Sequence, residues 1–437
     1  MTLDKLHFCA LARALAACLA GVLSCSQTAH AELQYGLGLG VGYTDNVLRD
    51  RSEIDETIGI ASIDAAWLEH TKRLDADVTV NLSYFDYLDE TVDSEWYGTA
   101  DGVIILGLVP ERFTWIFQDT FGQVQADPFQ PSTPETRENL NYFTTGPDIV
   151  LRFGASTYLQ IFGRYSTVDY EQSLLDAERT SGGFVLGRRL SGLGELTLTG
   201  LAEDVTFDDL PDQDFERQHV FLGYDVRGSR TEFRSELGYT WLELESGRRG
   251  GALANIAISR RVSPSSSLTL SFGTRFTDAS ESMRGGAVRV GRGGEITASA
   301  DPFENRWAGL SWDYTGNRTN FVIGVSWQDE DYEQQSEFDR TRLVYEARLT
   351  RSFTPTMEAG IRATRTDEEF DTTQFEADET QVAVDVNWRL GRAFGLTLTV
   401  DHTTRNAVGE LGEFDENRAY LMLTYRPRGG SFELMRP

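Results

Sequence analysis

Cysteine is confined to the first part of the chain. Of 437 residues only three are cysteine, namely Cys9, Cys18 and Cys25. All three lie in a segment that reads as a secretory signal, so the exported chain is expected to carry no thiol. Disulfide frameworks, cysteine–zinc sites and cysteine nucleophiles are therefore excluded.

The predicted signal spans residues 1–31. A weakly basic start precedes the apolar stretch Ala14–Leu23, and Ala29-His30-Ala31 gives a small-x-small cleavage site. A lipoprotein signal ending at Cys25 is the alternative, but the residues before Cys25 match that pattern poorly.

Long apolar runs and lysine are also scarce. Beyond the signal there is no stretch of about 18 apolar residues, which excludes membrane-spanning helices. Lys72 is the single lysine after residue 31, and the formal net charge of the chain is −28. This charge argues against nucleic acid as a partner, because phosphate binding needs a basic surface.

Apolar and polar residues alternate along most of the remaining chain. Leu268–Asp278 reads LTLSFGTRFTD, a period of two that gives a strand one apolar and one polar face. Many such strands in succession form either a large sandwich or a closed barrel. Export without a helical anchor, and no domain break about every 100 residues, favour an all-β fold: a single transmembrane antiparallel up-and-down β-barrel.

Short turns and longer acidic connections alternate between the strands. Nine short turns contain turn-forming residues, at 71–73, 109–112, 154–156, 191–195, 228–230, 263–265, 316–318, 354–356 and 391–394. The longer connections, expected to be surface loops, lie at 88–94, 125–138, 208–214, 328–338 and 367–378. With an opening strand at 33–45 and a closing strand at 417–425, the count is about 20 strands, with short periplasmic turns and long extracellular loops. The barrel would occupy residues 32–425, followed by a short tail at 426–437.

Strand parity assigns the two faces of the wall. Between Leu74 and Tyr84 the even-numbered residues are apolar, whereas the odd-numbered ones include Asp75 and Asp77. Because carboxylates do not face hydrocarbon, the odd positions are expected to face the lumen. The same reasoning puts Val384 outward. Aromatic residues gather near the strand ends, as in the girdles at the two membrane interfaces.

Mixed charge is predicted along the lumen wall. The candidates are Arg164, Arg227, Arg234, Arg275, Arg348, Arg362 and Arg389, facing Asp75, Asp77, Glu232, Glu236, Glu346, Glu358 and Asp385. Opposed rows of charge can guide polar solutes such as sugars, with Tyr158, Phe162 and Trp307 as aromatic faces. They can equally form ion pairs that stiffen the wall. Both interpretations stay open.

The longest connection runs from Ala279 to Asn305. It contains five glycines together with Arg284, Arg289 and Arg292. Connections of this length are usually functional or disordered. The segment either folds inward as a constriction over lumen carboxylates or remains a disordered surface loop.

No catalytic, cofactor or metal site can be assembled from the sequence. Only His70, His219 and His402 lie beyond residue 31, and none has partners at the spacing of a triad or a metal cluster. The acidic run at 208–216 lacks the glycine and final glutamate of a calcium loop. A solvated acidic surface, bridged by divalent ions to lipopolysaccharide, accounts for it. The chain is not expected to be an enzyme.

Residues 42–49 read GYTDNVLR. The pattern Tyr43-x-Asp45-Asn46-x-x-Arg49 resembles the opening of outer-membrane β-barrel porins encoded beside exopolysaccharide loci, the EpsL-like and PEP-CTERM-associated barrels. The resemblance implies a porin-like channel in the outer membrane of a Gram-negative bacterium, linked to exopolysaccharide export or secretion. A purely structural role for Asp45-Asn46, as a turn after a strand, fits the residues as well.

The partners expected on this basis are outer-membrane lipid, lipopolysaccharide, the exopolysaccharide and its export machinery. A non-conducting barrel that anchors a polysaccharide or protein assembly is the alternative function. Since the first strand is expected directly after the signal, a plug domain has no place, which favours a water-filled lumen at about 20 strands.

Overall fold

The computed structural model describes residues 32–190, 192–285, 296–373, 375–408 and 412–427. The expected signal at 1–31 and most of the expected tail lie outside the described residues.

Twenty β-strands make up most of the described chain. They are β1 (Glu32–Thr44), β2 (Glu56–His70), β3 (Leu74–Tyr87), β4 (Glu95–Val109), β5 (Phe113–Gln125), β6 (Arg137–Phe153), β7 (Thr157–Tyr170), β8 (Ala177–Arg189), β9 (Gly194–Phe207), β10 (Phe215–Arg227), β11 (Thr231–Leu244), β12 (Gly247–Ser263), β13 (Ser266–Thr277), β14 (Phe303–Thr315), β15 (Thr319–Tyr332), β16 (Arg340–Thr354), β17 (Met357–Phe370), β18 (Phe375–Arg389), β19 (Phe394–Ala407) and β20 (Phe414–Tyr425). Three short helices complete the described elements: η1 (Pro211–Gln213), α2 (Ala279–Gly285) and η2 (Ser336–Phe338).

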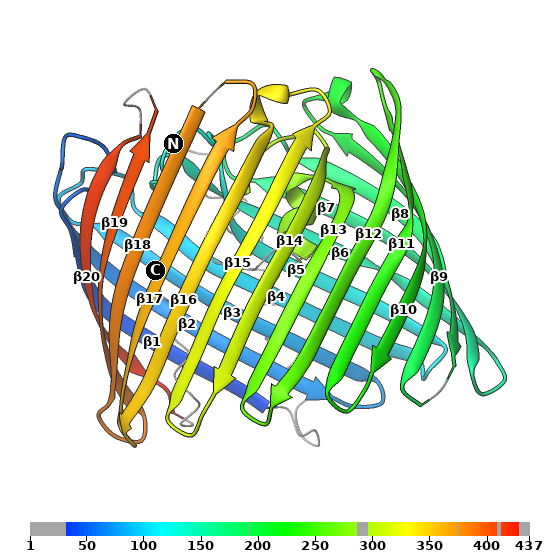
Figure 1. Ribbon diagram of the computed structural model, residues 1–437, viewed down its shortest axis with the longest axis horizontal. Helices are drawn as coiled ribbons and strands as arrows, with labels where there is room; N and C mark the ends of the chain where they lie inside the picture. Colours follow the sequence, from blue (N-terminus) through cyan, green and yellow to red (C-terminus); the bar gives the residue numbers. More distant parts are fainter. Residues whose placement is uncertain (1–31, 191, 286–295, 374, 409–411, 428–437) are drawn as a thin grey trace.

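The strands form one closed sheet. Each strand pairs antiparallel with its neighbours in sequence, and β1 pairs with β20, with Leu37 opposite Tyr425 and Thr44 opposite Arg418. The tilted strands of this barrel are seen in Figure 1. Closure leaves the sheet without free edge strands, so nearly all backbone N–H and C=O groups of the wall are paired within it. The prediction of a 20-stranded antiparallel up-and-down barrel is confirmed.

The nine predicted short turns all join strands at one end of the barrel, the lower end in Figure 1. Two predicted surface loops, at 328–338 and 367–378, are partly strand, so that prediction is corrected. The reason is ion pairing inside the wall: Arg340 contacts Glu330 at 2.7 Å and Glu368 at 3.1 Å. These contacts hold the acidic residues in the sheet and extend it beyond the predicted strand ends.

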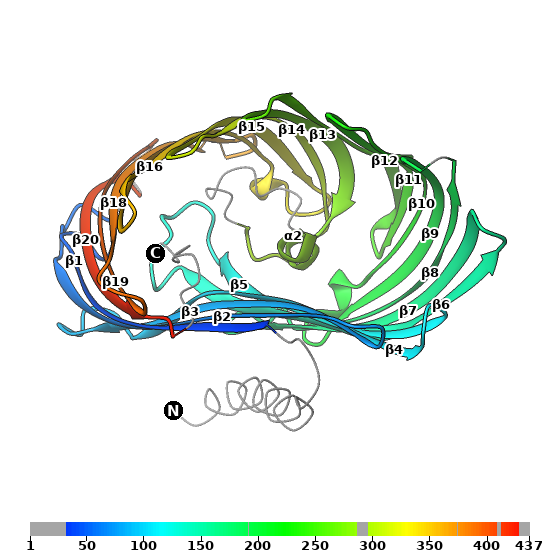
Figure 2. The ribbon, with the colours of Figure 1, turned by 90° about the horizontal axis from the view of Figure 1, so that it is seen from below.

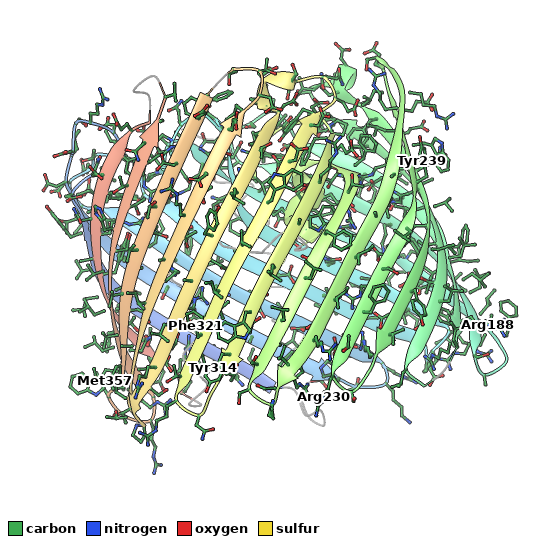
Figure 3. The ribbon with its side chains drawn as sticks, viewed as in Figure 1. Arg188, Arg230, Tyr239, Tyr314, Phe321 and Met357 are labelled. Carbon is green, nitrogen blue, oxygen red and sulfur yellow. The ribbon has the colours of Figure 1, made fainter. Side chains whose placement is uncertain are left out.

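Opposite residues on neighbouring strands share a face, and the apolar rows lie outward. Leu37 lies opposite Ile63, which lies opposite Leu82 on the next strand. Val384 is 45% exposed and points outward as predicted. In Figure 3, the labelled Tyr314 and Phe321 lie near the short-turn end of the wall, whereas Tyr239 lies near the opposite end. Such aromatic residues at both ends match the two interfacial girdles.

β13 separates from β12 after Thr274 but stays paired with β14 as far as Thr277. Its pairing with β12 extends only from Thr274 opposite Ala254 down to the short turn, and the chain then turns inward to form α2. Gly251 allows the Phe276 ring to lie close to the β12 backbone, because a Cβ at residue 251 would be 2.8 Å from that ring. Figure 2 shows α2 inside the barrel.

None of the helices in the described part of the chain is long and apolar enough to cross a membrane.

The connection from β5 to β6, residues 126–136, also lies inside the barrel, as Figure 2 shows. The expectation of a surface loop at 125–138 was therefore wrong. The physical reason is Phe129, whose ring packs 4.7 Å from Phe370 on β17 and 5.7 Å from Phe375 on β18. These contacts across the lumen remove apolar surface from water.

Replacing Val384 by Arg should reduce barrel stability by about 2–4 kcal/mol, because the guanidinium would face hydrocarbon near mid-strand. The matched change Asn387→Arg, on the lumen face of the same strand, should be mild. Urea unfolding in lipid vesicles, followed by the folded band on unboiled gels, measures both. Equal losses for the two variants would contradict the assignment of faces.

Candidate functional site

Buried charges fix the infolded helix α2 to the barrel wall. The wall contributes Arg179 on β8, Glu203 on β9 and Arg217 on β10. Glu203 and Arg217 are direct cross-strand partners. Because strand neighbours on one face lie side by side, the three side chains converge on one patch of the lumen wall.

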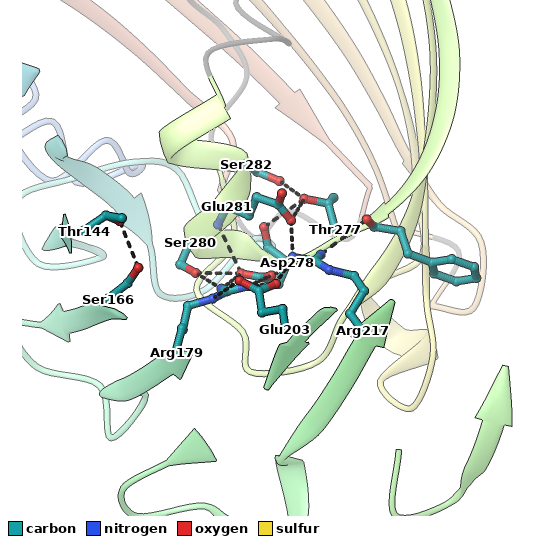
Figure 4. Close-up of polar contacts among 11 residues, drawn as sticks. Thr144, Ser166, Arg179, Glu203, Arg217, Thr277, Asp278, Ser280, Glu281 and Ser282 are labelled. Atoms are coloured by element: carbon teal, nitrogen blue, oxygen red, sulfur yellow. Dashed lines mark hydrogen bonds and ion pairs between the residues drawn. The ribbon is translucent and has the colours of Figure 1, made fainter. Parts of the chain in front are cut away.

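The segment that carries α2 contributes Asp278, Ser280 and Glu281. Arg179 donates to both Asp278 oxygens at 2.8 and 2.9 Å, and to Ser280 Oγ at 2.7 Å. Its Nε and Nη2 donate to the two Glu203 oxygens at 3.2 and 3.0 Å. Arg217 contacts both Glu203 and Glu281. Figure 4 shows these six residues, which we call the anchor cluster.

Asp278 also caps the helix. Its Oδ1 accepts a hydrogen bond from the backbone N–H of Glu281 at 3.1 Å, which satisfies one of the unpaired donors of the first turn. A single carboxylate therefore both starts α2 and fixes its first turn to the wall.

The anchor cluster is withdrawn from water. Arg179, Arg217 and Asp278 are 2%, 1% and 4% exposed. Burial alone would raise the pKa of Asp278, but the Arg179 and Arg217 guanidiniums outweigh it and lower that pKa well below its usual value. The Asp278 charge thus stabilises the docked helix at neutral pH, and this contribution is lost only in strong acid.

Further contacts hold α2 against the wall. The Arg284 guanidinium lies over the Tyr142 ring of β6, 5.1 Å from its centroid. Met283 is buried and packs so near β5 that a Cβ on Gly122 would lie 3.2 Å from its sulfur. α2 thus occupies lumen space on the side of β5 and β6 and narrows the interior.

The two infolded segments are joined to each other. Gln125, the last residue of β5, donates its N–H to the Ile296 carbonyl and accepts from the Ala298 N–H, both at 2.8 Å. Farther along, Asp301 accepts from the backbone N–H groups of Gln334 and Gln335 at 2.8 Å. Gln125 also donates from its side chain to the Gln130 carbonyl, so the described parts of 126–136 and 278–302 are connected through Gln125.

Several predicted lumen arginines lie on β7–β13 and contact acidic or aromatic side chains. Arg164 pairs with Asp148 at 2.7 Å, and Arg275 lies over Trp307, 5.8 Å from the ring centroid. Nearer the short turns, Asp225 lies 3.4 Å from Arg227 and 3.2 Å from Arg234. Arg275 approaches Glu236 at 3.8 Å, and the strand pairing sets Glu232 opposite Arg227.

The remaining candidates lie on β16–β18 and on β3. Arg348 lies opposite Arg362, Glu358 opposite Asn387, and Glu346 opposite Gly324, whereas Asp385 and Arg389 share the lumen face of β18. Asp75 and Asp77 belong to the lumen row of β3. Arg284 is on α2, and Arg289 and Arg292 lie outside the described residues.

The three histidines are far apart. His70 contacts Asp75 at 2.7 Å beside a short turn, and His219 is on the lumen face of β10. His402 points outward and contacts Asn417 at 3.0 Å. Among the described residues, no group of three or more histidine, cysteine, aspartate or glutamate side chains could hold a metal ion.

The residues Tyr43, Asp45, Asn46 and Arg49 lie where the barrel closes. Asp45 accepts from the backbone and side chain of Asn417 at 2.7 and 2.8 Å. Asn46 is fully buried and donates to the Asp415 carbonyl at 3.0 Å. Arg49 pairs with Glu416 at 2.9 Å and donates to the Ser132 carbonyl at 2.7 Å. These contacts join β1 to β20. Arg49 also joins both strands to the β5–β6 connection at 126–136, which we call the infolded loop.

A cavity of about 240 Å³ lies in the lumen near this closure. We call it the arginine pocket, because its lining includes Arg49, Arg137, Arg342, Arg362, Arg405 and Arg418. Sequence reasoning named only Arg49 and Arg362 among these.

Sequence reasoning also missed the anchor cluster. Asp278 followed three residues later by Glu281 is a helix-start signal, which could have indicated α2. Nothing in the sequence indicated the wall residues Arg179, Glu203 and Arg217 beyond their position on the lumen face. Their partners are distant in sequence.

Comparison with known proteins gives only distant likenesses. No protein-family model and no curated protein matches the chain. Among solved structures it is similar to a mutant of the ferric enterobactin receptor PfeA from Pseudomonas aeruginosa, with 10% identity and a TM-score of 0.47, over 92% of this chain and 81% of that one. It is also similar to OccK2 (OpdF) of Pseudomonas aeruginosa in complex with glucuronate, with 11% identity and a TM-score of 0.41, over 91% and 98% of the two chains. A BenF-like porin from Pseudomonas fluorescens Pf-5 has 12% identity and a TM-score of 0.40, over 90% and 99%. At these values the likenesses assign no function.

The barrel itself is more informative. An even-numbered closed sheet with an outward apolar surface is the architecture of bacterial outer-membrane proteins. The chain is thus an outer-membrane β-barrel of a Gram-negative bacterium.

Replacing Asp278 by Asn should release α2 from the wall and raise single-channel conductance. The change removes the carboxylate that accepts two hydrogen bonds from the buried Arg179 guanidinium, and loss of one partner of a buried ion pair typically costs about 3–5 kcal/mol. Conductance in planar bilayers tests this, with Asp208→Asn, a loop position with the same charge change, as the control. Normal conductance in a folded Asp278→Asn barrel would contradict the anchoring role.

Proposed function

We propose that this protein is a porin-like channel that lets small polar solutes cross the outer membrane. The observation that carries the proposal is a polar, charge-lined lumen narrowed by a helix that is fixed to the wall. Water-filled barrels commonly owe their selectivity to charged side chains at such a narrowing.

The lumen of the barrel supports this proposal at both ends. The arginine pocket lies near the barrel closure, and a second cavity toward the short turns is lined by Tyr158, Glu195, Arg227 and Arg234. Charged walls with an aromatic face suit hydroxyl-rich solutes, which need hydrogen-bond partners and a flat apolar surface.

The link to exopolysaccharide export or secretion is the narrower part of the proposal. It rests on the resemblance of Tyr43, Asp45, Asn46 and Arg49 to the exopolysaccharide-associated barrels. The contacts of Asp45, Asn46 and Arg49 join β1 to β20, so the motif specifies no solute. Lipopolysaccharide, the exopolysaccharide and its export machinery are the proposed partners, with no cofactor and no catalytic role.

A non-conducting barrel that anchors an assembly is the second candidate. The observation that favours it is the connection of segments 126–136 and 278–302 through Gln125. This connection fixes the segments that occupy the lumen to each other. The two candidates differ in whether ions pass through the folded protein.

Purified protein in a planar bilayer should pass ions at a steady open level. Arg284→Ala should shift selectivity toward cations, because it removes a positive charge from the narrow part of the lumen. Arg230→Ala, in a short turn outside the lumen, serves as the control. Oligosaccharides of the cognate polymer should block the current transiently.

A correctly inserted but silent protein would favour the anchor candidate. Conduction without any oligosaccharide block would leave a general diffusion porin and remove the exopolysaccharide link.

A further inference from the structure

The lining of the arginine pocket contains more basic than acidic side chains. It contains six arginines and three glutamates, Glu368, Glu379 and Glu416, in a chain whose formal net charge is −28. Both Arg49 and Arg418 share Glu416, at 2.9 and 3.7 Å, and Arg342 pairs with Glu368 at 2.8 Å. Two carboxylates outside the lining also pair with its arginines, Glu95 with Arg137 and Asp401 with Arg418 at 2.8 Å. Glu379 lies opposite Arg405 in the strand register. Six arginines thus face five acidic side chains, and a small excess of positive charge remains.

Arg405 is the exceptional member of this lining. It lies on the lumen face of β19 and is only 5% exposed. Its Nε and Nη2 have no hydrogen-bond partner among the described residues. Most buried polar groups in folded proteins are hydrogen-bonded, so two unpartnered donors on one buried guanidinium point to a ligand.

These two nitrogens form the edge of a guanidinium that binds a carboxylate side-on. Other arginines of the described chain use this edge. Arg179 gives Nε and Nη2 to the two oxygens of Glu203 at 3.2 and 3.0 Å, and Arg137 holds Glu95 through the same two nitrogens. Arg405 lines the pocket and has the same donor pair without a partner among the described residues. Two parallel N–H···O bonds would give both affinity and geometric specificity.

The rest of the lining suits a sugar. Thr364, Thr366 and Gln381 offer hydroxyl and amide groups. Tyr97 and Tyr420 add aromatic rings, over which Arg137 and Arg418 also lie. Hydroxyl groups on a ring need such hydrogen-bond partners, whereas the apolar face of a ring packs on aromatic side chains. A bare inorganic anion would use the arginines alone.

We propose that the arginine pocket is a binding site for acidic sugars, in which the sugar carboxylate pairs side-on with Arg405. The inference rests on the proposed channel function, because it names the class of solute that the channel would recognise. The surplus positive charge of the pocket attracts the carboxylate, and Arg405 fixes its orientation.

Calorimetric titration of the full-length protein in detergent micelles tests the site directly. Galacturonate and galactose form a matched pair of probes, because only the first carries a carboxylate. Galacturonate should bind at least about tenfold more tightly than galactose, as expected for a buried charge-assisted contact. Equal binding of the two sugars, or of galacturonate and inorganic phosphate, would overturn the proposal.

Variants locate the contact within the pocket. Arg405→Gln should weaken galacturonate binding by about tenfold, and Arg405→Lys should weaken it nearly as much, because lysine keeps the charge but lacks the two-donor edge. Arg318→Gln, the same charge change in a short turn, should leave binding unchanged. Equal losses in Arg405→Gln and Arg318→Gln would show a general charge effect and contradict the site.

Binding in micelles does not depend on conduction. A silent protein that binds galacturonate would overturn the channel proposal alone, whereas a conducting protein that binds both sugars equally would overturn the acidic-sugar site alone. The comparison of galacturonate with galactose on the unaltered protein holds even where an Arg405 variant fails to fold.

Discussion

Closure of the backbone hydrogen-bond ladder is the constraint on which the rest of this structure depends. Hydrocarbon offers no partner for an exposed N–H or C=O group, so a sheet within a membrane has to pair its first strand with its last. Here β1 meets β20 over Leu37–Thr44, and Asp45, Asn46 and Arg49 add side-chain contacts just beyond the last pair. These side-chain contacts continue the pairing of β1 with β20 beyond the end of the backbone ladder, where the loops begin.

Closure of the barrel also determines which side chains face lipid and which face the lumen. Once the sheet is closed, alternate residues of every strand face either lipid or the lumen, and charged groups have only the lumen available. The lumen then becomes the place where buried ion pairs can form, and the anchor cluster and the arginine pocket are both built from such inward rows. They differ in how their arginines are paired: Arg179 of the anchor cluster pairs with Glu203 and Asp278, whereas two donors of Arg405, which lines the pocket, have no hydrogen-bond partner among the described residues.

Those features that depend on local periodicity were predictable from the sequence. A period of two identifies a strand and its two faces within a few residues, so the outward position of Val384 was predicted correctly. Glycine, proline and asparagine mark the short turns, so the number of strands was also predicted correctly. The infolded loop was not predictable, because Phe129 meets Phe370 and Phe375 only after the wall curves round. Most of the arginine pocket was missed for a similar reason: which inward arginine lacks an acceptor depends on neighbours from distant strands.

The claim that a helix occupies the lumen can be tested most directly with two engineered cysteines. Gly122→Cys and Met283→Cys lie within disulfide reach, because a Cβ at residue 122 would be 3.9 Å from the Met283 Cγ. Gly122→Cys combined with Ser229→Cys, in a short turn, is the control pair. We predict that mild oxidation of the folded barrel joins residues 122 and 283 and protects both from a maleimide label. Full labelling of both thiols in the folded barrel, as in the control pair, would contradict it.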